Sequence, residues 1–448
     1  MGSPPIEHVW ETYICRGNRS LRGVAMRAFR TSSVGLFWRP LTTNNSVVGA
    51  VAWVATVWLG MQPALAAAPS LLELVHDGKQ FEGRLEAKGH DACWLMGRDG
   101  QLWAFELSRV ESVRTIADHF HEFSSAELRD QLRRQLPKHF HIEGTGHFLI
   151  CAEQNNRKIG EICEETYRTF RRYFSVRGFK ISEPEFPLVV IVFPDRDAFV
   201  QYCRKDKLEP PAGMLGYYMR LTNRIALFDQ GDSGLAAATT NLPTSAGSQS
   251  LASLFDRHDS DRALLPAGDQ PGGRATMPVR FDAIVEGDLH STIVHETTHQ
   301  VAFNTGLHSR IAQTPKWVIE GLATMFEAPG IRDGVKSSPS MTRINRNRYL
   351  WFENYLKSRR RPHSLKDFVG TDDLYASSTL DAYAEGWALT FFLAEMRHGS
   401  YGRYLKSLVA RNPLLVYTED ERVADFRRAF GNLKSLEAEY VRFYENLR

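Results

Sequence analysis

The sequence predicts an α+β protein in which β-rich segments come first and helical segments follow. Runs such as Gln80–Leu85 and Pro187–Phe193 have the length and residue types of strands. From about residue 284 onward, apolar residues recur at the spacing of helices. A chain of 448 residues is long enough for two or three domains of roughly 100–200 residues each.

The composition is that of an ordinary globular protein, with 43% hydrophobic and 24% charged residues. The 55 Lys and Arg residues nearly balance the 52 Asp and Glu residues, which gives a net charge of +3. A protein that binds a polyanion usually carries a clear basic excess. We therefore expect no nucleic-acid partner.

Residues 1–68 have the pattern of a signal or targeting segment. An arginine-rich stretch precedes the uncharged apolar run Val47–Met61, and Pro63 and Ala64-Leu65-Ala66 follow. The order of basic, apolar and small residues is typical of a secretory signal. The apolar run has about 15 residues, whereas a membrane span needs about 20. We expect a secreted, periplasmic or envelope protein, and an uncleaved segment is the alternative that would attach it to a membrane.

Residues 69–117 predict a small β accessory domain without a catalytic constellation. Its short segments alternate with turn signals such as Asp77-Gly78 and Asp99-Gly100, which favour hairpins.

Residues 118–230 predict a mixed β-sheet subdomain. Its expected elements are His147–Cys151, Ile159–Phe174, Pro187–Phe193, Ala198–Cys203 and the hairpin Met214–Phe228. The uninterrupted apolar run Pro187–Phe193 suits a strand buried on both faces.

The cysteines contain no CxxC spacing, so a cysteine zinc site is not expected. Cys93, Cys151, Cys163 and Cys203 lie beyond the targeting segment. Four buried thiols or one disulfide is a simpler interpretation than a full disulfide framework.

Residues 231–283 are rich in Gly, Ser, Thr, Ala and Pro and predict a flexible insertion. The alternative is a more specific role for this segment, as a lid over a site.

Residues 284–448 predict a helical subdomain. Its central feature is His295-Glu296-Thr297-Thr298-His299, an HExxH motif in a mostly buried helix that Gly306 ends. Residues four apart share a helix face, so both imidazoles can face one ion. Glu296 is then placed to reach a water on that ion.

A third ligand is available at Glu320, in the segment Trp317-Val-Ile-Glu-Gly-Leu-Ala. Thr314 and Pro315 suit the N-cap and the first position of a new helix. Two histidines and one carboxylate would leave a fourth position for water, as catalytic zinc sites do. Glu327 follows on the same helix, either as a partner of a ligand histidine or as an exposed carboxylate.

HExxH followed by Trp-x-x-Glu-Gly-x-Ala resembles the gluzincin group of zinc metallopeptidases. The resemblance covers roughly residues 140–440 and is greatest to an uncharacterised bacterial branch of predicted secreted proteins with a peptidase-like domain. It implies a zincin-like fold, Zn²⁺ held by His295, His299 and Glu320, and Glu296 as general base. It also implies a sheet whose edge strand lines the substrate cleft, and the Met214–Phe228 hairpin can supply that strand. Thr324 stands where thermolysin-like enzymes carry Asp, which is a departure from their pattern.

Tyr383 is the candidate donor to the oxyanion, because related enzymes often place a Tyr or His after the third ligand. Its spacing with Trp387 and Phe391 also fits a residue of the core, and Tyr375 is a weaker candidate. Arg343, Asn345, Asn347 and Arg348 can hold a peptide carboxylate, although a solvated face is the simpler interpretation. We interpret Arg359-Arg360-Arg361 as solvated, and Glu385 as facing the cleft or pairing with a cation.

The sequence therefore predicts a zinc metallopeptidase that acts on a peptide or protein. The same ligands would serve a hydrolase of a non-protein amide or ester, such as a cell-wall component. A third alternative is a binding protein that keeps the peptidase fold without turnover, although a binder has no need of the base Glu296.

Overall fold

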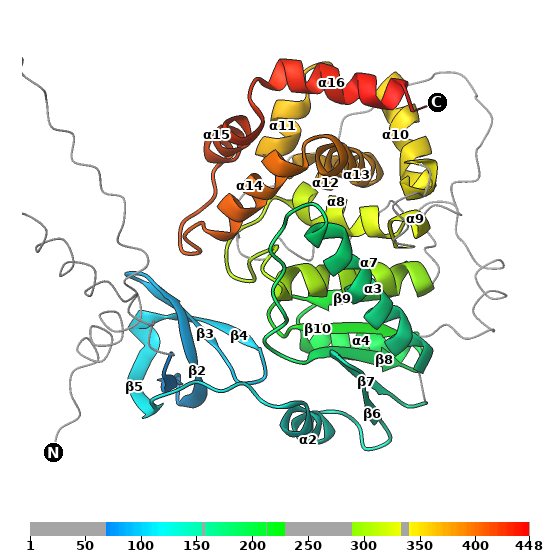
Figure 1. Cartoon of the computed structure of the whole chain (residues 1–448). Helices are drawn as coiled ribbons and strands as arrows, with labels where there is room; N and C mark the ends of the chain where they lie inside the picture. The colour runs from blue at the N-terminus through cyan, green and yellow to red at the C-terminus, as the bar shows by residue number, and fades with distance from the viewer. Residues whose placement is uncertain (1–68, 155–156, 212, 229–288, 333–339, 448) are drawn as a thin grey trace, which may run out of the picture. The chain divides into compact units, whose positions relative to one another are not determined.

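The structure is a computed structural model that describes residues 69–154, 157–211, 213–228, 289–332 and 340–447 (Figure 1). The predicted targeting segment 1–68 and the predicted insertion 231–283 lie outside these residues. The described part is α+β, with β-sheets followed by a helical C-terminal region, as the sequence predicts. None of the helices in the described ranges combines the length and hydropathy that a membrane span requires.

The described residues fall into two compact units, one with residues 69–85 and 106–121 and the other with residues 86–105 and those from 122 onward. The first sheet has the strand order β4-β3-β2-β1-β5. Its elements are β1 (Leu71–His76), β2 (Lys79–Lys88), β3 (Ala92–Met96), β4 (Leu102–Glu106), the 3-10 turn η2 (Leu107–Arg109) and β5 (Val110–Ala117). Asp77 and Gly78 join β1 to β2 with φ of 49° and 69°, the conformation that an Asp-Gly hairpin turn requires.

The second sheet is mixed and has the order β6-β7-β8-β10-β9. β7 runs parallel to β8, and β8 runs parallel to β10, whereas β6 and β9 are antiparallel to their neighbours and form the two edges. The elements of this part are α2 (Ser125–Gln135), β6 (His141–Gly144), β7 (Phe148–Ala152), α3 (Arg157–Ser175), β8 (Leu188–Phe193), α4 (Arg196–Lys205), β9 (Gly216–Met219) and β10 (Arg224–Phe228).

Both faces of this sheet are covered, which explains the uninterrupted apolar run at β8. Leu188, Val190 and Val192 pack with residues of α3 and α7, while the alternate Val189 and Ile191 pack with residues of α2 and α4. All six residues of β8 are buried, as the sequence predicts for a strand between two layers. The four cysteines of the described residues are buried free thiols.

The C-terminal region consists of helices packed around α13, whose residues from Asp381 to Ala394 are all buried. α13 contacts α8, α10, α12, α14 and α16 (Figure 1). The elements are α7 (Leu289–Asn304), α8 (Lys316–Phe326), α9 (Pro329–Arg332), η4 (Ser340–Arg343), α10 (Arg346–Ser358), α11 (Leu365–Gly370), α12 (Asp373–Ser377), α13 (Thr379–Met396), α14 (His398–Val409), α15 (Glu419–Phe430) and α16 (Leu433–Glu445).

The predicted N-terminus of α8 is wrong in two respects. The helix begins one residue later than predicted, and a different residue caps it. The helix begins at Lys316, Pro315 occupies the N-cap position, and Thr314 makes no capping hydrogen bond. The carboxylate of Asp372 accepts a hydrogen bond from the Lys316 backbone N–H instead, at 3.0 Å. A tertiary partner 56 residues away therefore replaces the local cap, and it places a negative charge at the positive end of the helix.

Candidate metal centre

The HExxH helix α7 is anchored between the second sheet and α3. The Gln300 side-chain amide donates to the backbone carbonyl oxygens of Val189 on β8 and of Asn223 in the β9–β10 turn, at 3.2 and 2.8 Å. On α3, the Cys163 thiol lies 3.4 Å from the Thr297 hydroxyl. These contacts fix the rotation of α7 about its axis and so determine which residues face α8.

His295, His299 and Glu320 converge into one group that can hold a metal ion. The Nε2 atoms of the two histidines are 3.1 Å apart, and they lie 3.4 and 3.6 Å from Oε2 of Glu320. Ligands at about 2.1 Å from a tetrahedral ion are about 3.4 Å from one another. The three atoms thus have the mutual spacing of three corners of such a site.

The electrostatics of this group also fit a cation. Oε2 of Glu320 and Nδ1 of His299 are buried and have no hydrogen-bond partner among the described residues. Although burial opposes ionisation, the neighbouring imidazoles hold the pKa of Glu320 well below its usual range. Burial disfavours the imidazolium of His295, yet the neighbouring carboxylates of Glu320 and Glu327 raise its pKa to about 10. A buried carboxylate beside two imidazoles thus attracts positive charge, which a proton or a metal ion can provide.

Glu327 lies behind His295, so the structure resolves the two alternatives that the sequence left for it. Its Oε1 is 2.8 Å from Nδ1 of His295, and its Oε2 accepts a hydrogen bond from the Asn345 side chain at 2.7 Å. Asn345 also donates to the carbonyl oxygen of Thr324 at 2.9 Å. The carboxylate therefore orients the imidazole and leaves its Nε2 facing the group. Asn345 is itself buried, so its expected place on a solvated face is wrong.

Glu296 is buried beside the group and contacts the edge of the sheet. Its Oε2 accepts a hydrogen bond from the backbone N–H of Tyr218 on the edge strand β9, at 2.7 Å. Burial raises the pKa of Glu296 above its usual range, against the opposing effect of His295 and His299. A carboxylate with a raised pKa is better suited to hold a proton than an exposed one.

A network of side-chain amides fixes the edge strand against α7. The Tyr218 hydroxyl donates to Asn223 at 2.9 Å, and the Asn223 amide donates to Asn304 at 2.9 Å. Asn223 has a φ of 59°, a left-handed conformation that asparagine tolerates at a turn. The sequence predicts the hairpin that contains Asn223, within Met214–Phe228, but the contacts of Asn223 with Asn304 and Gln300 depend on the tertiary fold.

Two glycines bring α8 and α13 into close contact. A Cβ on Gly321 would lie 2.3 Å from the carbonyl oxygen of Gly386 and 2.3 Å from the Thr390 hydroxyl. Only glycine fits at this helix crossing, which gives the Glu-Gly pair of the Trp-x-x-Glu-Gly segment a packing reason. Glu320 is thereby held on a helix that is buried at every residue.

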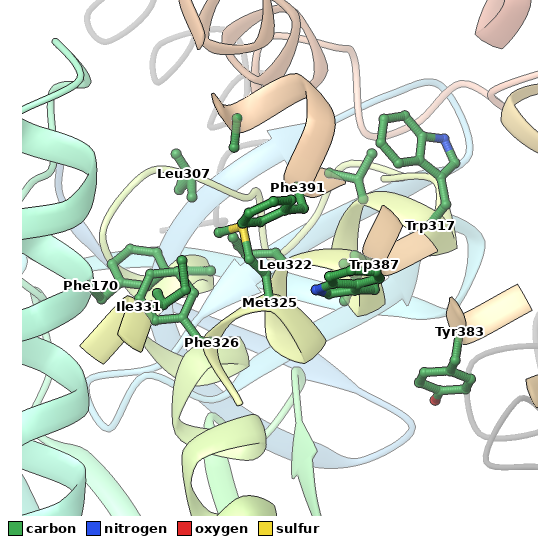
Figure 2. Close-up of a cluster of buried hydrophobic side chains, with 14 of the residues drawn as sticks. Phe170, Leu307, Trp317, Leu322, Met325, Phe326, Ile331, Tyr383, Trp387 and Phe391 are labelled. Carbon is green, nitrogen blue, oxygen red and sulfur yellow. The ribbon is translucent and has the colours of Figure 1, made fainter. Parts of the chain in front are cut away.

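Tyr383 lies at the border of the core and not in its middle. Trp387 and Phe391 stack on each other with ring centroids 5.7 Å apart, whereas the Tyr383 hydroxyl points away from both (Figure 2). Burial first, and then the negative charge of Glu320, raises the pKa of Tyr383 far above its usual range. The Tyr375 ring packs against it at 5.5 Å, but the Tyr375 hydroxyl is buried. Of the two tyrosines, Tyr375 is the one whose hydroxyl is fully buried without a hydrogen-bond partner among the described residues.

The interpretation of Arg359-Arg360-Arg361 as a solvated run is wrong for Arg360. Its side chain is 3% exposed and forms ion pairs with Glu385 and Glu437, at 2.9 and 2.7 Å. Arg359 pairs with Asp381, while Arg361 is exposed. Glu385 therefore pairs with a cation, which was one of its two expected roles. A pattern of three adjacent arginines does not show which side chain the segment after α10 directs inward.

The fold and this group define an α+β protein with a buried candidate metal centre of two histidines and one carboxylate. A family model described as a protein of unknown function, DUF1570, matches residues 289–415, which include all the residues of the group. No curated protein matches the chain.

Proposed function

We propose that this protein is a zinc-dependent metallopeptidase of the gluzincin type, with a zincin-like catalytic unit. The observation that carries the proposal is the convergence of His295, His299 and Glu320 with a buried Glu296 beside them. Two imidazoles and one carboxylate are a donor set that suits Zn²⁺ and leaves a position open for catalysis.

A zinc ion held by these three residues would act as a Lewis acid and lower the pKa of a bound water towards neutrality. Glu296 accepts the proton of the attacking water and passes it to the leaving amine. The Tyr218 backbone N–H orients the Glu296 carboxylate through the 2.7 Å hydrogen bond. Tyr383 donates a hydrogen bond to the oxyanion that forms at the scissile carbonyl.

The edge strand favours a peptide over a non-protein amide or ester. β9 is the last strand of its sheet, and it contacts Glu296 directly. The edge strand of a sheet can bind an extended peptide as an additional strand. A peptide bound along β9 would thereby pass close to the base. Secretion remains part of the proposal and rests on the sequence pattern of residues 1–68.

The test is a peptide-library digest read by mass spectrometry, with the zinc-loaded wild type and the Glu296→Gln variant. The variant keeps its size and its metal ligands but loses the base, so cleavage should fall by about 10²–10⁴-fold while zinc is retained. Glu439→Gln, which changes an exposed carboxylate on α16, is the matched control and should cleave like the wild type. Equal cleavage by Glu296→Gln, or no cleavage by zinc-loaded wild type, would refute the proposal.

A further inference from the structure

Arg348 differs from Arg343 and Arg360 in how its positive charge is balanced. It lies in the first turn of α10, and its side chain is only 18% exposed. Arg343 and Arg360 each have an ion pair with a carboxylate at 2.9 Å. The Arg348 guanidinium has its nearest carboxylate, Glu327, at 3.9 Å, and no hydrogen bond to another described residue is found for it.

Glu327 is not available as a full partner for Arg348. Its Oε1 is engaged with His295, and its Oε2 accepts a hydrogen bond from Asn345. Burial raises the pKa of Glu327, but the pKa is lowered overall. The positive charge of Arg348 is the largest of the effects that lower it. The planar guanidinium carries five N–H donors, and no described residue accepts a hydrogen bond from them.

The same guanidinium lies close to the proposed catalytic residues. Its central carbon is 5.3 Å from the centre of the Tyr383 ring, and Glu327 links it to the metal ligand His295. The first turn of a helix adds its own positive potential to that of the side chain. A mostly buried cation with free donors beside a hydrolytic site is suited to bind an anion.

We propose that Arg348 binds a carboxylate of the substrate, so that the enzyme prefers peptides that carry one near the scissile bond. This inference rests on the proposed peptidase function. A carboxylate is the anion that peptides provide, and it fits the guanidinium as a bidentate partner. It comes either from the free C-terminus or from an Asp or Glu side chain.

The experiment compares matched peptides on the zinc-loaded protein. One pair differs only in a free carboxylate or an amide at the C-terminus, and a second pair differs only in Asp or Asn beside the scissile bond. The wild type should cleave one carboxylate form with a kcat/KM about tenfold or more above its neutral partner, mainly through KM. The pair that shows the difference identifies the source of the carboxylate.

Arg348→Gln should reduce that ratio to about one, and Arg348→Lys should restore only part of it, because lysine keeps the charge but not the planar fork. Arg346→Gln changes an exposed arginine of the same helical turn and should leave the ratio at its wild-type value. A purely structural role of Arg348 through Glu327 would lower cleavage of both partners equally and leave the ratio intact.

An intact ratio in Arg348→Gln, or equal cleavage of both forms in every pair by the wild type, overturns the inference and leaves the peptidase proposal standing. If the zinc-loaded wild type cleaves neither form of any library peptide, the proposed function fails and the inference fails with it.

Discussion

Two buried groups of charged side chains lie in the helical region, and they differ in the source of their positive charge. In the Arg360 group, one guanidinium contacts Glu385 and Glu437, so the cation is part of the chain. In the metal group, the buried Glu320 faces two imidazoles whose Nε2 atoms also face each other. In the first group, the guanidinium of Arg360 balances the negative charge of the two glutamates. In the second group, a proton or a metal ion from solution can balance the negative charge of Glu320.

This difference separates a structural ion pair from a candidate site better than burial does. Glu385 and Glu320 are both almost fully buried glutamates on neighbouring helices. For Glu385, burial raises the pKa in spite of Arg360, while for Glu320 the imidazoles lower it despite burial. The comparison predicts that one group contributes to stability and that the other binds metal, and the following variants test it.

The largest expected effect comes from removing the internal cation. Arg360→Met should lower the free energy of unfolding by about 3–5 kcal/mol, because Glu385 and Glu437 would remain buried without a partner. Urea denaturation measures the change. Arg361→Met removes an exposed neighbouring cation and should cost less than about 1 kcal/mol. Equal losses in the two variants would show that the Arg360 group is not the buried ion pair described above.

A smaller effect is expected at the partner of the ligand histidine. Glu327→Gln removes the negative charge beside Nδ1 of His295, and metal affinity should fall by about 10–100-fold. Competition with a chromophoric chelator measures the affinity. The exposed substitution Glu439→Gln should leave it unchanged. An unaltered affinity in Glu327→Gln would mean that this carboxylate does not support the metal centre.

An effect of the same size or smaller is expected in the pH dependence of metal binding. Because the pKa of His295 is raised to about 10, a proton competes with the metal throughout the neutral range. Apparent affinity should therefore continue to rise between pH 7 and pH 9, by up to about tenfold per pH unit. Isothermal titration at several pH values measures this slope. An affinity that becomes constant above pH 7 would indicate a histidine with an ordinary pKa.

Short-range patterns predicted much of the fold and the candidate site. The spacing of His295 and His299 in a helix is a local property, and so is the apolar run of β8 between two layers. The α+β class followed from such patterns, whereas the expectation that Glu320 joins the two histidines also needed the resemblance of its Trp-x-x-Glu-Gly segment to a known group of proteins.

Contacts between distant residues account for the rest. Asp372 replaces Thr314 at the start of α8, and nothing near Thr314 in the sequence indicates it. The inward turn of Arg360 depends on α13 and α16, which provide its two carboxylates. Similarly, the choice between the two roles of Glu327 depends on how α8 packs against α7. Each of these contacts is formed only when the helices assemble, so a local pattern cannot determine it.

The metal content of the purified protein tests the central claim most directly. Elemental analysis of wild type prepared with zinc in the medium should find about one zinc ion per chain. His299→Ala should lose the ion, and His398→Ala, which changes an exposed histidine at the start of α14, should keep it. Wild-type protein without zinc, or His299→Ala with an undiminished content, would contradict the assignment of His295, His299 and Glu320 as the metal centre.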